Sequence, residues 1–330
     1  MMDSLRLGIM YEILKPVERT SCLPSDAFSE YEPIETIELI ERAAVKLGHR
    51  TKRLGGPLEL LSNPRMISGI DAVFNIAEGF GSRNREAWAP ILLEMHGVPC
   101  IGSDALTLST SLDKHWTKLI VSQAGVPVVP GVAIQIGEEC LTPFDFPLFV
   151  KPRFEGSAKG ISRNSRVNSQ VELNAAIANV HSNYGQDAIV EPFLDGAEYT
   201  VAVIGNDSLE VFPILQRAID KASGIGLHAV EEEAGPYADY GLSGHITATL
   251  EEKLARFTCK AFQALGCFDF ARVDFRMGKQ DEPLFLEINP LPTFSPEGTF
   301  GIISELEGQE VEDLVGMAIA RGLKRLGFKE

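Results

Sequence analysis

Apolar residues in the first hundred positions follow two different patterns. Continuous apolar runs at 5–11 and 70–77 predict buried strands of a parallel sheet. Between them, over 32–49, apolar residues recur at helical spacing, with a proline at the start and a glycine at the end. A further helix is expected over 85–97. This alternation of strand and helix predicts an α/β unit with a parallel sheet up to about residue 105.

The pattern changes in the second third of the chain. A helix is expected over 110–125, closed by a glycine, and after it short apolar runs bounded by turn residues predict a mostly antiparallel, α+β region, with strands at 146–152, 187–194, 198–205 and 209–215. Residues 217–247 are acidic and rich in glycine without clear periodicity, so a long loop is expected there; such loops are usually functional. Two more amphipathic helices are expected, over 247–266 and 310–327.

Two alternating runs near the C-terminus carry polar residues on one face and apolar residues on the other. If 270–277 and 284–289 pair as a hairpin, Asp274 faces Glu287 and Arg272 faces Asn289. Two carboxylates directly opposite each other are unfavourable. A divalent cation bound between the two carboxylates makes their proximity favourable, and Mg²⁺ prefers such oxygen ligands together with phosphates. A solvated polar face with a chance pair of acids remains the alternative, although the opposite faces are wholly apolar.

A second candidate is a glycine-containing loop that follows a predicted strand. Lys151 ends the strand, and Gly156 and Gly160 bracket Ser157. Backbone N–H groups of such a loop can surround a phosphate, with the lysine supplying charge. The spacing matches neither a Walker A loop nor GxGxxG, so an ordinary hairpin turn remains an alternative. Further candidates, which singly are typical of solvated surface residues, are Lys114, Glu191 and Glu198.

Length and charge narrow the classes of function. A chain of 330 residues is expected to form two or three domains. The net charge of −16 argues against nucleic acid or an anionic membrane as the main partner. Five widely spread cysteines without a CxxC pair indicate reduced thiols in a cytoplasmic protein. We expect no signal peptide, and no apolar run approaches the ~20 residues of a membrane span.

Five sequence blocks together carry a family resemblance: "SLDKHWTK", "FVKPRFEGSAKGIS", "IVEPFLDGAEYTV", "ARVDF" and "FLEINPLP". These blocks resemble those of the ATP-grasp carboxylate–amine ligases, and among these the D-alanine–D-alanine ligase family, both in their order and nearly in their spacing. The resemblance runs from about residue 70 to the C-terminus. The resemblance implies a three-domain ATP-grasp architecture, with ATP between the second and third domains. The domains would be an N-terminal parallel α/β domain, 1–105, a central subdomain with a glycine-rich flap, 106–197, and a C-terminal subdomain with a metal site, 198–330.

The resemblance also implies a role for each matching residue. ATP phosphates would contact Lys114 and Lys151, and the rest of the nucleotide would contact Glu191, Pro192, Leu194, Glu198 and Leu286. Two Mg²⁺ ions, with Mn²⁺ as a substitute, would be bound by Asp274, Glu287 and Asn289. The catalytic group would be Arg272, which stabilises developing charge, with Ser157 on the flap near the acceptor site.

The likeness fails in the amino-acid pockets. Glu78 stands where the family has a histidine, and Arg83, Arg85 and Glu86 replace an acidic turn. Thr299 stands where the family has a serine for the second substrate's carboxylate. The family has an early glutamate that holds the first substrate's amine, and here only Glu35 could replace it. The family's mobile loop carries a tyrosine–lysine pair, and residues 217–247 have no such pair at the corresponding positions.

The function expected from these patterns is an ATP-dependent carboxylate–amine ligase. It would form an amide bond through an acyl phosphate from small amino-acid or carboxylate substrates that need not include D-alanine. Glu78, Arg83 and Thr299 are the candidate substrate contacts; Arg83 and Arg85 suggest an anionic substrate group or are simply solvated. The alternatives are a true D-alanine–D-alanine ligase with divergent pockets, a carboxylate kinase or ATPase, and a non-catalytic nucleotide-binding protein. Dimers are common in the family, so a homodimer is compatible with the resemblance.

Overall fold

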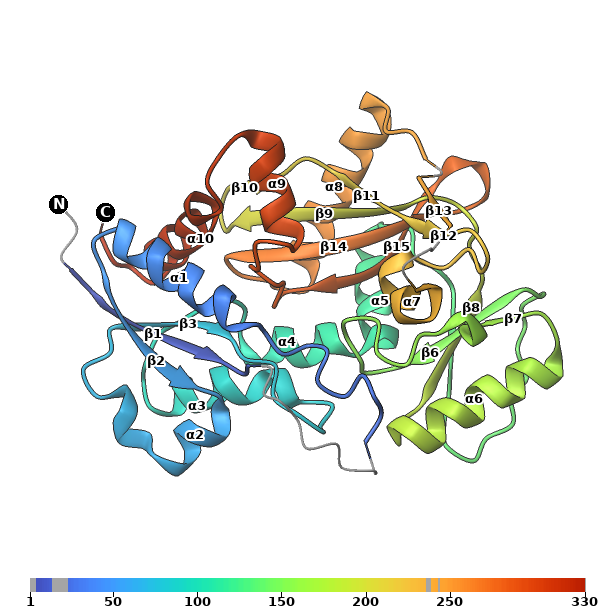
Figure 1. Ribbon diagram of the computed structural model, residues 1–330, viewed down its shortest axis with the longest axis horizontal. Coiled ribbons are helices and arrows are strands. Elements are labelled where there is room, and N and C mark those ends of the chain that lie inside the picture. The colour runs from blue at the N-terminus through green and yellow to red at the C-terminus, as the bar shows by residue number, and fades with distance from the viewer. Residues whose placement is uncertain (1–3, 14–22, 236–238, 243, 330) are drawn as a thin grey trace.

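The computed structural model describes residues 4–13, 23–235, 239–242 and 244–329 (Figure 1). Its first sheet is parallel, in the order β2-β1-β3-β4, as the strand–helix pattern predicted. The strands are β1 (Arg6–Tyr11), β2 (Arg50–Gly55), β3 (Ala72–Ile76) and β4 (Cys100–Ile101), and the helices among them are α1 (Ile34–Lys46), α2 (Pro57–Ser62) and α3 (Trp88–Met95). The carboxyl ends of β1, β2 and β3 therefore meet at one edge.

The second sheet is antiparallel and has the order β5-β8-β6-β7. Its strands are β5 (Val132–Ile134), β6 (Leu148–Pro152), β7 (Arg166–Val167) and β8 (Ala188–Pro192). Helix α6 (Gln170–Tyr184) covers this sheet with Leu173, Ile177 and Val180, which form a core with Leu148 and Val190. The sequence analysis did not predict α6, whose buried apolar residues are accompanied by an exposed one, Val171, so that the helical pattern is blurred.

The third sheet is also antiparallel, and its three long strands are β9 (Glu198–Gly205), β14 (Phe270–Met277) and β15 (Pro283–Asn289), in that order. Strands β10 (Leu209–Val211) and β11 (Leu215–Arg217) pair with successive parts of β9. The predicted hairpin register is confirmed, since Asp274 pairs with Glu287 and Arg272 with Asn289. A bulge follows Asp274, so that Phe275 faces Phe285. Helix α8 (Ala248–Ala264), as expected, packs on this sheet.

Two expectations about local structure were wrong. The single helix expected over 110–125 is divided into α4 (Ala105–Leu112) and α5 (Lys114–Gln123), because Asp113 is extended and its carboxylate caps α5. The loop expected over 217–247 contains β12 (Ile219–Asp220), α7 (Leu227–Ala234) and β13 (Tyr240–Gly241). Asp220 organises its first turn by accepting bonds from Ser223 and from Arg163. Residues 236–238 and 243 of this stretch lie outside the described residues.

The C-terminal helices α9 (Thr299–Glu307) and α10 (Val311–Arg325) return to the first sheet (Figure 1). Their apolar residues share a core with β1, β3 and α1, and Phe270 contacts both Phe74 and Phe294 in its centre. Helix α1 thus packs against α10 and the sheet, which was the favoured expectation for it. Short 3₁₀ turns lie at Pro64–Ile67, Arg85–Ala87, Arg163–Ser165 and Lys279–Asp281. None of the helices in the described ranges has the length and apolar character needed to cross a membrane.

Candidate active site

A cavity of about 600 Å³ lies between the second and third sheets. Residues from α5, β6, β8, β9, β14 and β15 line it, so segments more than 150 residues apart meet there. It gathers most residues that the sequence analysis selected, namely Lys114, Lys151, Ser157, Glu191, Pro192, Leu194, Glu198, Arg272, Asp274, Leu286, Glu287 and Thr299. The cavity is therefore the candidate active site.

The start of α5 positions Lys114 at one wall of this cavity. Asp113 caps the helix by accepting from the backbone N–H groups of His115 and Trp116, each at 3.1 Å. Arg153, just after β6, donates two hydrogen bonds of 2.9 and 2.7 Å to the same carboxylate. Lys114 then reaches across to Glu287, whose Oε2 lies 2.6 Å from the lysine Nζ. Burial opposes ionisation of Glu287, but the charges of Lys114 and Lys151 lower its pKa to about 2.

Glu191, at the end of β8, is buried between two lysines. Lys151 lies 3.2 Å from its Oε2, and Lys118 contacts its Oε1. The pKa of the glutamate is lowered, because the two ammonium charges outweigh the effect of burial. Burial, aided by the charge of Lys151, lowers the pKa of Lys118 to about 8. The site therefore carries excess positive charge on this wall, which favours an anionic ligand.

Strand β14 presents Arg272 and Asp274 on the cavity side. Arg272 donates to Asp274 Oδ2 at 3.1 Å through Nε, and Thr200 donates to the other carboxylate oxygen at 2.7 Å. Arg217, on β11, donates to the same threonine at 2.9 Å. Arg272 and Arg217 are thus both held at the cavity by contacts on β9 and β14, where they can meet negative charge.

Asp274, Glu287 and Asn289 carry the oxygen donor atoms that a magnesium site requires. Within the described ranges, no cluster of three or more His, Cys, Asp or Glu could hold a metal alone. The two carboxylates lie opposite each other on paired strands, and Asn289 lines a small adjoining cavity with Glu287. Mg²⁺ commonly takes one or two carboxylates and completes its shell with phosphates. The donor set therefore fits magnesium held jointly by the protein and a nucleotide.

At another part of the cavity wall, Glu198 accepts a hydrogen bond of 3.2 Å from Arg276. His228, on α7, lies 3.9 Å from the same carboxylate. Desolvation by the cavity walls and the charges of Arg217 and Arg272 lower the pKa of His228, so the imidazole is neutral near pH 7. A carboxylate and a neutral imidazole can both accept hydrogen bonds from hydroxyl groups, which suits a ribose.

The glycine-containing loop after β6, called the flap here (residues 153–160), closes over this cavity. Ser157 and Ala158 have positive φ angles of 45° and 59°, which is uncommon outside glycine. Strain of this kind is held in place by the surroundings, and several of the flap's contacts come from the N-terminal third of the chain. Asp26 accepts from the Gly160 N–H at 2.8 Å, and Glu30 accepts from the Gly156 N–H at 2.8 Å.

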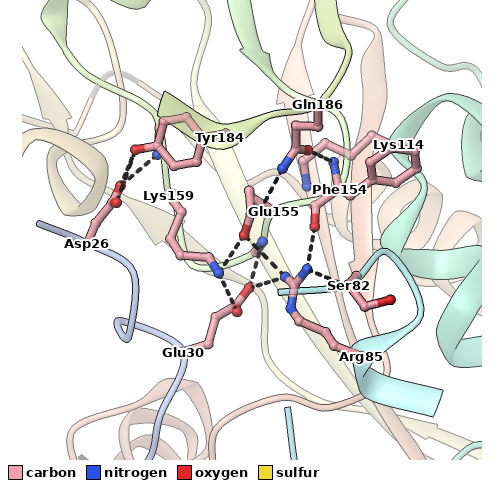
Figure 2. A network of polar contacts seen from close by, with 12 residues as sticks. Asp26, Glu30, Ser82, Arg85, Lys114, Phe154, Glu155, Lys159, Tyr184 and Gln186 are labelled. Carbon is pink, nitrogen blue, oxygen red and sulfur yellow. Dashed lines mark hydrogen bonds and ion pairs between the residues drawn. The ribbon is translucent and has the colours of Figure 1, made fainter. Parts of the chain in front are cut away.

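Figure 2 shows the buried ion pairs that complete this attachment. Glu30 lies between Arg85, at 2.8 Å, and Lys159, at 2.6 Å, while Glu155 contacts both cations. Arg85 also donates to the carbonyl of Phe154 at 2.9 Å. This set, which we call the flap network (Glu30, Arg85, Glu155 and Lys159), joins the flap to the first sheet's side of the molecule.

The predicted substrate contacts are separated by the fold. Thr299 lines the main cavity, and Glu78 lines the small adjoining cavity of about 30 Å³ with Ser157 and Arg272. Arg83 lines neither: it is exposed, and its guanidinium lies 5.0 Å from the Phe154 ring centre and 5.3 Å from that of Trp116. Glu35 is exposed at the start of α1.

Several functional candidates escaped the sequence analysis: Lys118, Arg217, His228, Arg276, Glu30 and Lys159. Lys118 had a usable signal, since it lies one helical turn after Lys114 and shares its face. Glu30 and Lys159 had none, since their 129-residue separation is bridged only by the tertiary fold.

Comparisons with known proteins agree with this geometry. A family model described as "D-ala D-ala ligase C-terminus" matches residues 120–320. The D-alanine–D-alanine ligase of Carboxydothermus hydrogenoformans is 32% identical, over 88% of this chain and 93% of its own. An uncharacterized protein, y4sG, of Sinorhizobium fredii is also 32% identical, over 83% of each chain. Among solved structures, the ATP complex of the Bacillus anthracis D-alanine–D-alanine ligase has a TM-score of 0.73 at 18% identity, covering 99% of this chain and 100% of that one. The Enterococcus faecalis VanG D-Ala:D-Ser ligase has a TM-score of 0.72 at 20% identity, covering 97% and 100%.

The fold is thus the ATP-grasp fold, and the protein is an ATP-dependent ligase that forms a carbon–nitrogen bond. The chain belongs to the D-alanine–D-alanine ligase family, and the resemblance seen in its sequence blocks is confirmed. Small molecules are accordingly its substrates.

Proposed function

We propose that the chain activates the carboxylate of one amino acid with ATP and joins it to the amine of a second, through an acyl phosphate. The observation that carries this proposal is the register of β14 and β15. It sets Asp274 opposite Glu287 in the cavity that also holds Lys114, Lys151 and Arg272. Such a cavity offers both carboxylates for cations and cations for phosphates.

In the proposed first step, a carboxylate oxygen of the first substrate attacks the γ-phosphorus of ATP, and the bond to the β-phosphate oxygen breaks. Lys114 and Lys151 bind phosphate oxygens, while Glu191, Pro192, Leu194 and Leu286 border the adenine and Glu198 holds the ribose. Magnesium, when bound at Asp274, Glu287 and Asn289, supplies charge neutralisation for the phosphates, and Mn²⁺ is its expected substitute.

In the second step, the amine of the other substrate attacks the acyl carbon, and phosphate leaves with the electron pair of its carbon–oxygen bond. Arg272 donates to the oxyanion that forms at that carbon, a contribution of roughly 3 kcal/mol for one such donor. The flap, with Ser157, covers the acceptor side and excludes water, which would otherwise hydrolyse the acyl phosphate. Thr299 and Glu78 are the proposed contacts of the amino-acid groups.

The proposal keeps three domains, 1–105, 106–197 and 198–330, because each of the three large sheets lies within one of these ranges. It also places the protein in the cytoplasm. Support comes from Cys100, Cys140, Cys259 and Cys267, which are free thiols.

The substrates need not be D-alanine. The VanG neighbour is described as a D-Ala:D-Ser ligase, so a protein of this fold takes a second amino acid other than D-alanine. A true D-alanine–D-alanine ligase is the second candidate, because relatives at 27% and 32% identity carry that name.

Phosphate release from Mg·ATP, measured across D- and L-amino acids with products read by mass spectrometry, tests the proposal. Wild type should release phosphate only when an acid and an amine are both present, with one amide formed per phosphate. Arg272→Met should lower kcat by about 10²–10³, whereas Arg256→Met, at an exposed position of α8, should leave it unchanged. Phosphate release without an amide product would instead indicate a carboxylate kinase or an ATPase.

A further inference from the structure

A separate cavity of about 450 Å³ lies at the carboxyl edge of the first sheet. Tyr11 at the end of β1, Gly55 at the end of β2 and Gly79 just after β3 all line it. In α/β sheets, ligands commonly bind at the carboxyl ends of the strands. None of the roles assigned above involves this cavity, although its volume is in the ordinary range of ligand sites.

Five of the described residues that line this cavity are aromatic, namely Tyr11, Phe28, Tyr31, Phe80 and Trp88. The Phe28 and Phe80 rings stack at 5.1 Å, and the rings of Phe28 and Tyr31 lie 5.3 Å apart. Phe80 is 38% exposed and Leu58, on another wall, is 64% exposed. These apolar groups thus line an open cavity and are not fully used in the packing of a core.

Among the described residues that line the cavity, the charged side chains are both acids, Glu12 and Glu59. Glu12 accepts from the backbone N–H of Glu78 at 2.9 Å, and Glu59 accepts from that of Gly56 at 3.2 Å. In the part of the chain that the structure describes, neither carboxylate forms an ion pair with a lysine or arginine. Burial raises the pKa of Glu12, as expected for a carboxylate without a cationic partner. Aromatic faces and unpaired carboxylates both attract cations.

The cavity adjoins the proposed reaction centre through two chain segments. Glu78 lines the small cavity beside Ser157 and Arg272, and the next residues, Gly79 and Phe80, line the aromatic cavity. In the same way, Glu30 lines the small cavity and Tyr31 the aromatic one. Consecutive residues of both segments thus line the two cavities, so the cavities lie next to each other along these segments. This proximity places the aromatic cavity within reach of the side chain of an amino acid that binds beside Arg272.

Resting on the proposed ligase function, we propose that this cavity binds the side chain of one amino-acid substrate, and that this side chain is long and ends in an ammonium or guanidinium group. The aromatic rings contact its methylene groups, and Glu12 and Glu59 neutralise its charge. The methyl group of alanine would leave almost all of the 450 Å³ unfilled.

Matched substrates separate chain length from charge. Amide formation is measured with alanine, norleucine and lysine as the varied substrate, in both enantiomers, and with citrulline and arginine as a second charged and uncharged pair. For the accepted enantiomer, kcat/KM should rise at least tenfold from alanine to norleucine, and at least tenfold again from norleucine to lysine. The steps reflect burial of methylene groups and pairing of the charge. Equal or better use of alanine overturns the inference while the ligase function stands.

Substitutions assign the preference to the cavity. Glu12→Gln keeps a hydrogen-bond acceptor but removes the charge, so the preference for lysine over norleucine should fall at least tenfold. Glu59→Gln should lower it in the same direction and serves if Glu12→Gln does not fold. Glu94→Gln, an exposed acid on α3, is the matched control and should retain the full preference. An unchanged preference in both cavity variants overturns the inference.

Calorimetric titration with lysine and norleucine, without ATP, gives a readout that does not depend on catalysis. Lysine should bind wild type at least tenfold more tightly than norleucine, and Glu12→Gln should abolish the difference. If no amino-acid pair yields an amide while lysine still binds in this Glu12-dependent way, the proposed ligase reaction fails and the ligand class of the cavity stands. Equal affinity for lysine and norleucine overturns the assigned class.

Discussion

Replacing Glu30 with glutamine tests the flap network. In the wild type, two cations, Arg85 and Lys159, are balanced by two carboxylates, Glu30 and Glu155. The side chains of Arg85, Glu30 and Lys159 are 3%, 5% and 6% exposed, so water cannot compensate for a missing charge. Glutamine retains the shape of the side chain and can still accept from the Gly156 N–H, which isolates the effect of the charge.

Loss of one partner from a buried ion pair typically costs 3–5 kcal/mol. Glu155 still contacts both cations after the substitution, so we expect the lower end, about 3 kcal/mol of unfolding free energy. The matched surface control is Glu41→Gln, which breaks the partly exposed Arg53–Glu41 pair of 2.6 Å. A pair of that kind contributes about 0–1 kcal/mol.

The effect should also depend on pH with a defined sign. Arg85 and Lys159 outweigh the burial of Glu30 and lower its pKa below the usual 4.5. A carboxylate whose pKa is lowered by folding stabilises the protein above the unfolded pKa, and this stability is lost as pH falls through the folded pKa. The difference between wild type and Glu30→Gln should therefore be complete at pH 7 and shrink below pH 4.5.

Urea unfolding measures the change in the free energy of global unfolding, and hydrogen exchange at the Gly156 amide measures the change in the free energy of local opening of the flap. We expect faster Gly156 exchange in Glu30→Gln and unchanged exchange in Glu41→Gln. If Glu30→Gln costs no more than the surface control and Gly156 remains equally protected, the network does not hold the flap and the reasoning is refuted.

Three further predictions concern the metal site, a buried acid and the shared core. Glu287→Gln should lower Mg·ATP turnover at least 10²-fold while the circular-dichroism spectrum stays native. Glu282→Gln, at an exposed position of the adjacent turn, should leave this turnover unchanged. Equal phosphate release by the two variants would remove Glu287 from the metal site. Burial raises the pKa of Glu86 to about 7, so its contribution to stability is lost as pH rises through 7. Between pH 5 and 8, Glu86→Gln should therefore lose less stability than wild type. Urea midpoints that change in parallel with pH for the two proteins would contradict this. Phe270→Ala should cost about 3–5 kcal/mol in urea unfolding, because the ring is fully buried between Phe74 and Phe294, and a cost below 1 kcal/mol would show that the core refills the space.

Local periodicity explains which parts of the fold were predictable. The register of β14 and β15 followed from alternation, because a slip of one residue would turn every apolar side chain out of the core. The bulge after Asp274 did not follow, since it depends on how the neighbouring strand β9 and the hairpin fit together. Helix α7 was missed because its eight residues carry no apolar stripe long enough to distinguish it from a loop.

Two arginines, Arg83 and Arg85, show how far the residues of the candidate site could be predicted from the sequence. Arg83 and Arg85 are identical in type and two residues apart, so no local rule distinguishes them. The fold turns Arg83 outward onto Phe154 and Trp116, and buries Arg85 between Glu30 and Glu155. Burial of a charge is decided by partners distant in sequence, whereas the ligase blocks were recognisable because their residues are close in sequence.

The core that joins β1 and β3 to α10 has a consequence for how the chain is made. During synthesis, α10 follows β3 by more than 200 residues, which corresponds to a delay of roughly 10–50 s at the usual rate of elongation. For that time the nascent first sheet lacks the cover that Phe294, Phe300 and α10 provide in the finished protein. The nascent chain therefore exposes an apolar sheet face for tens of seconds, and the first sheet is covered only after residues 294–325 have been synthesised.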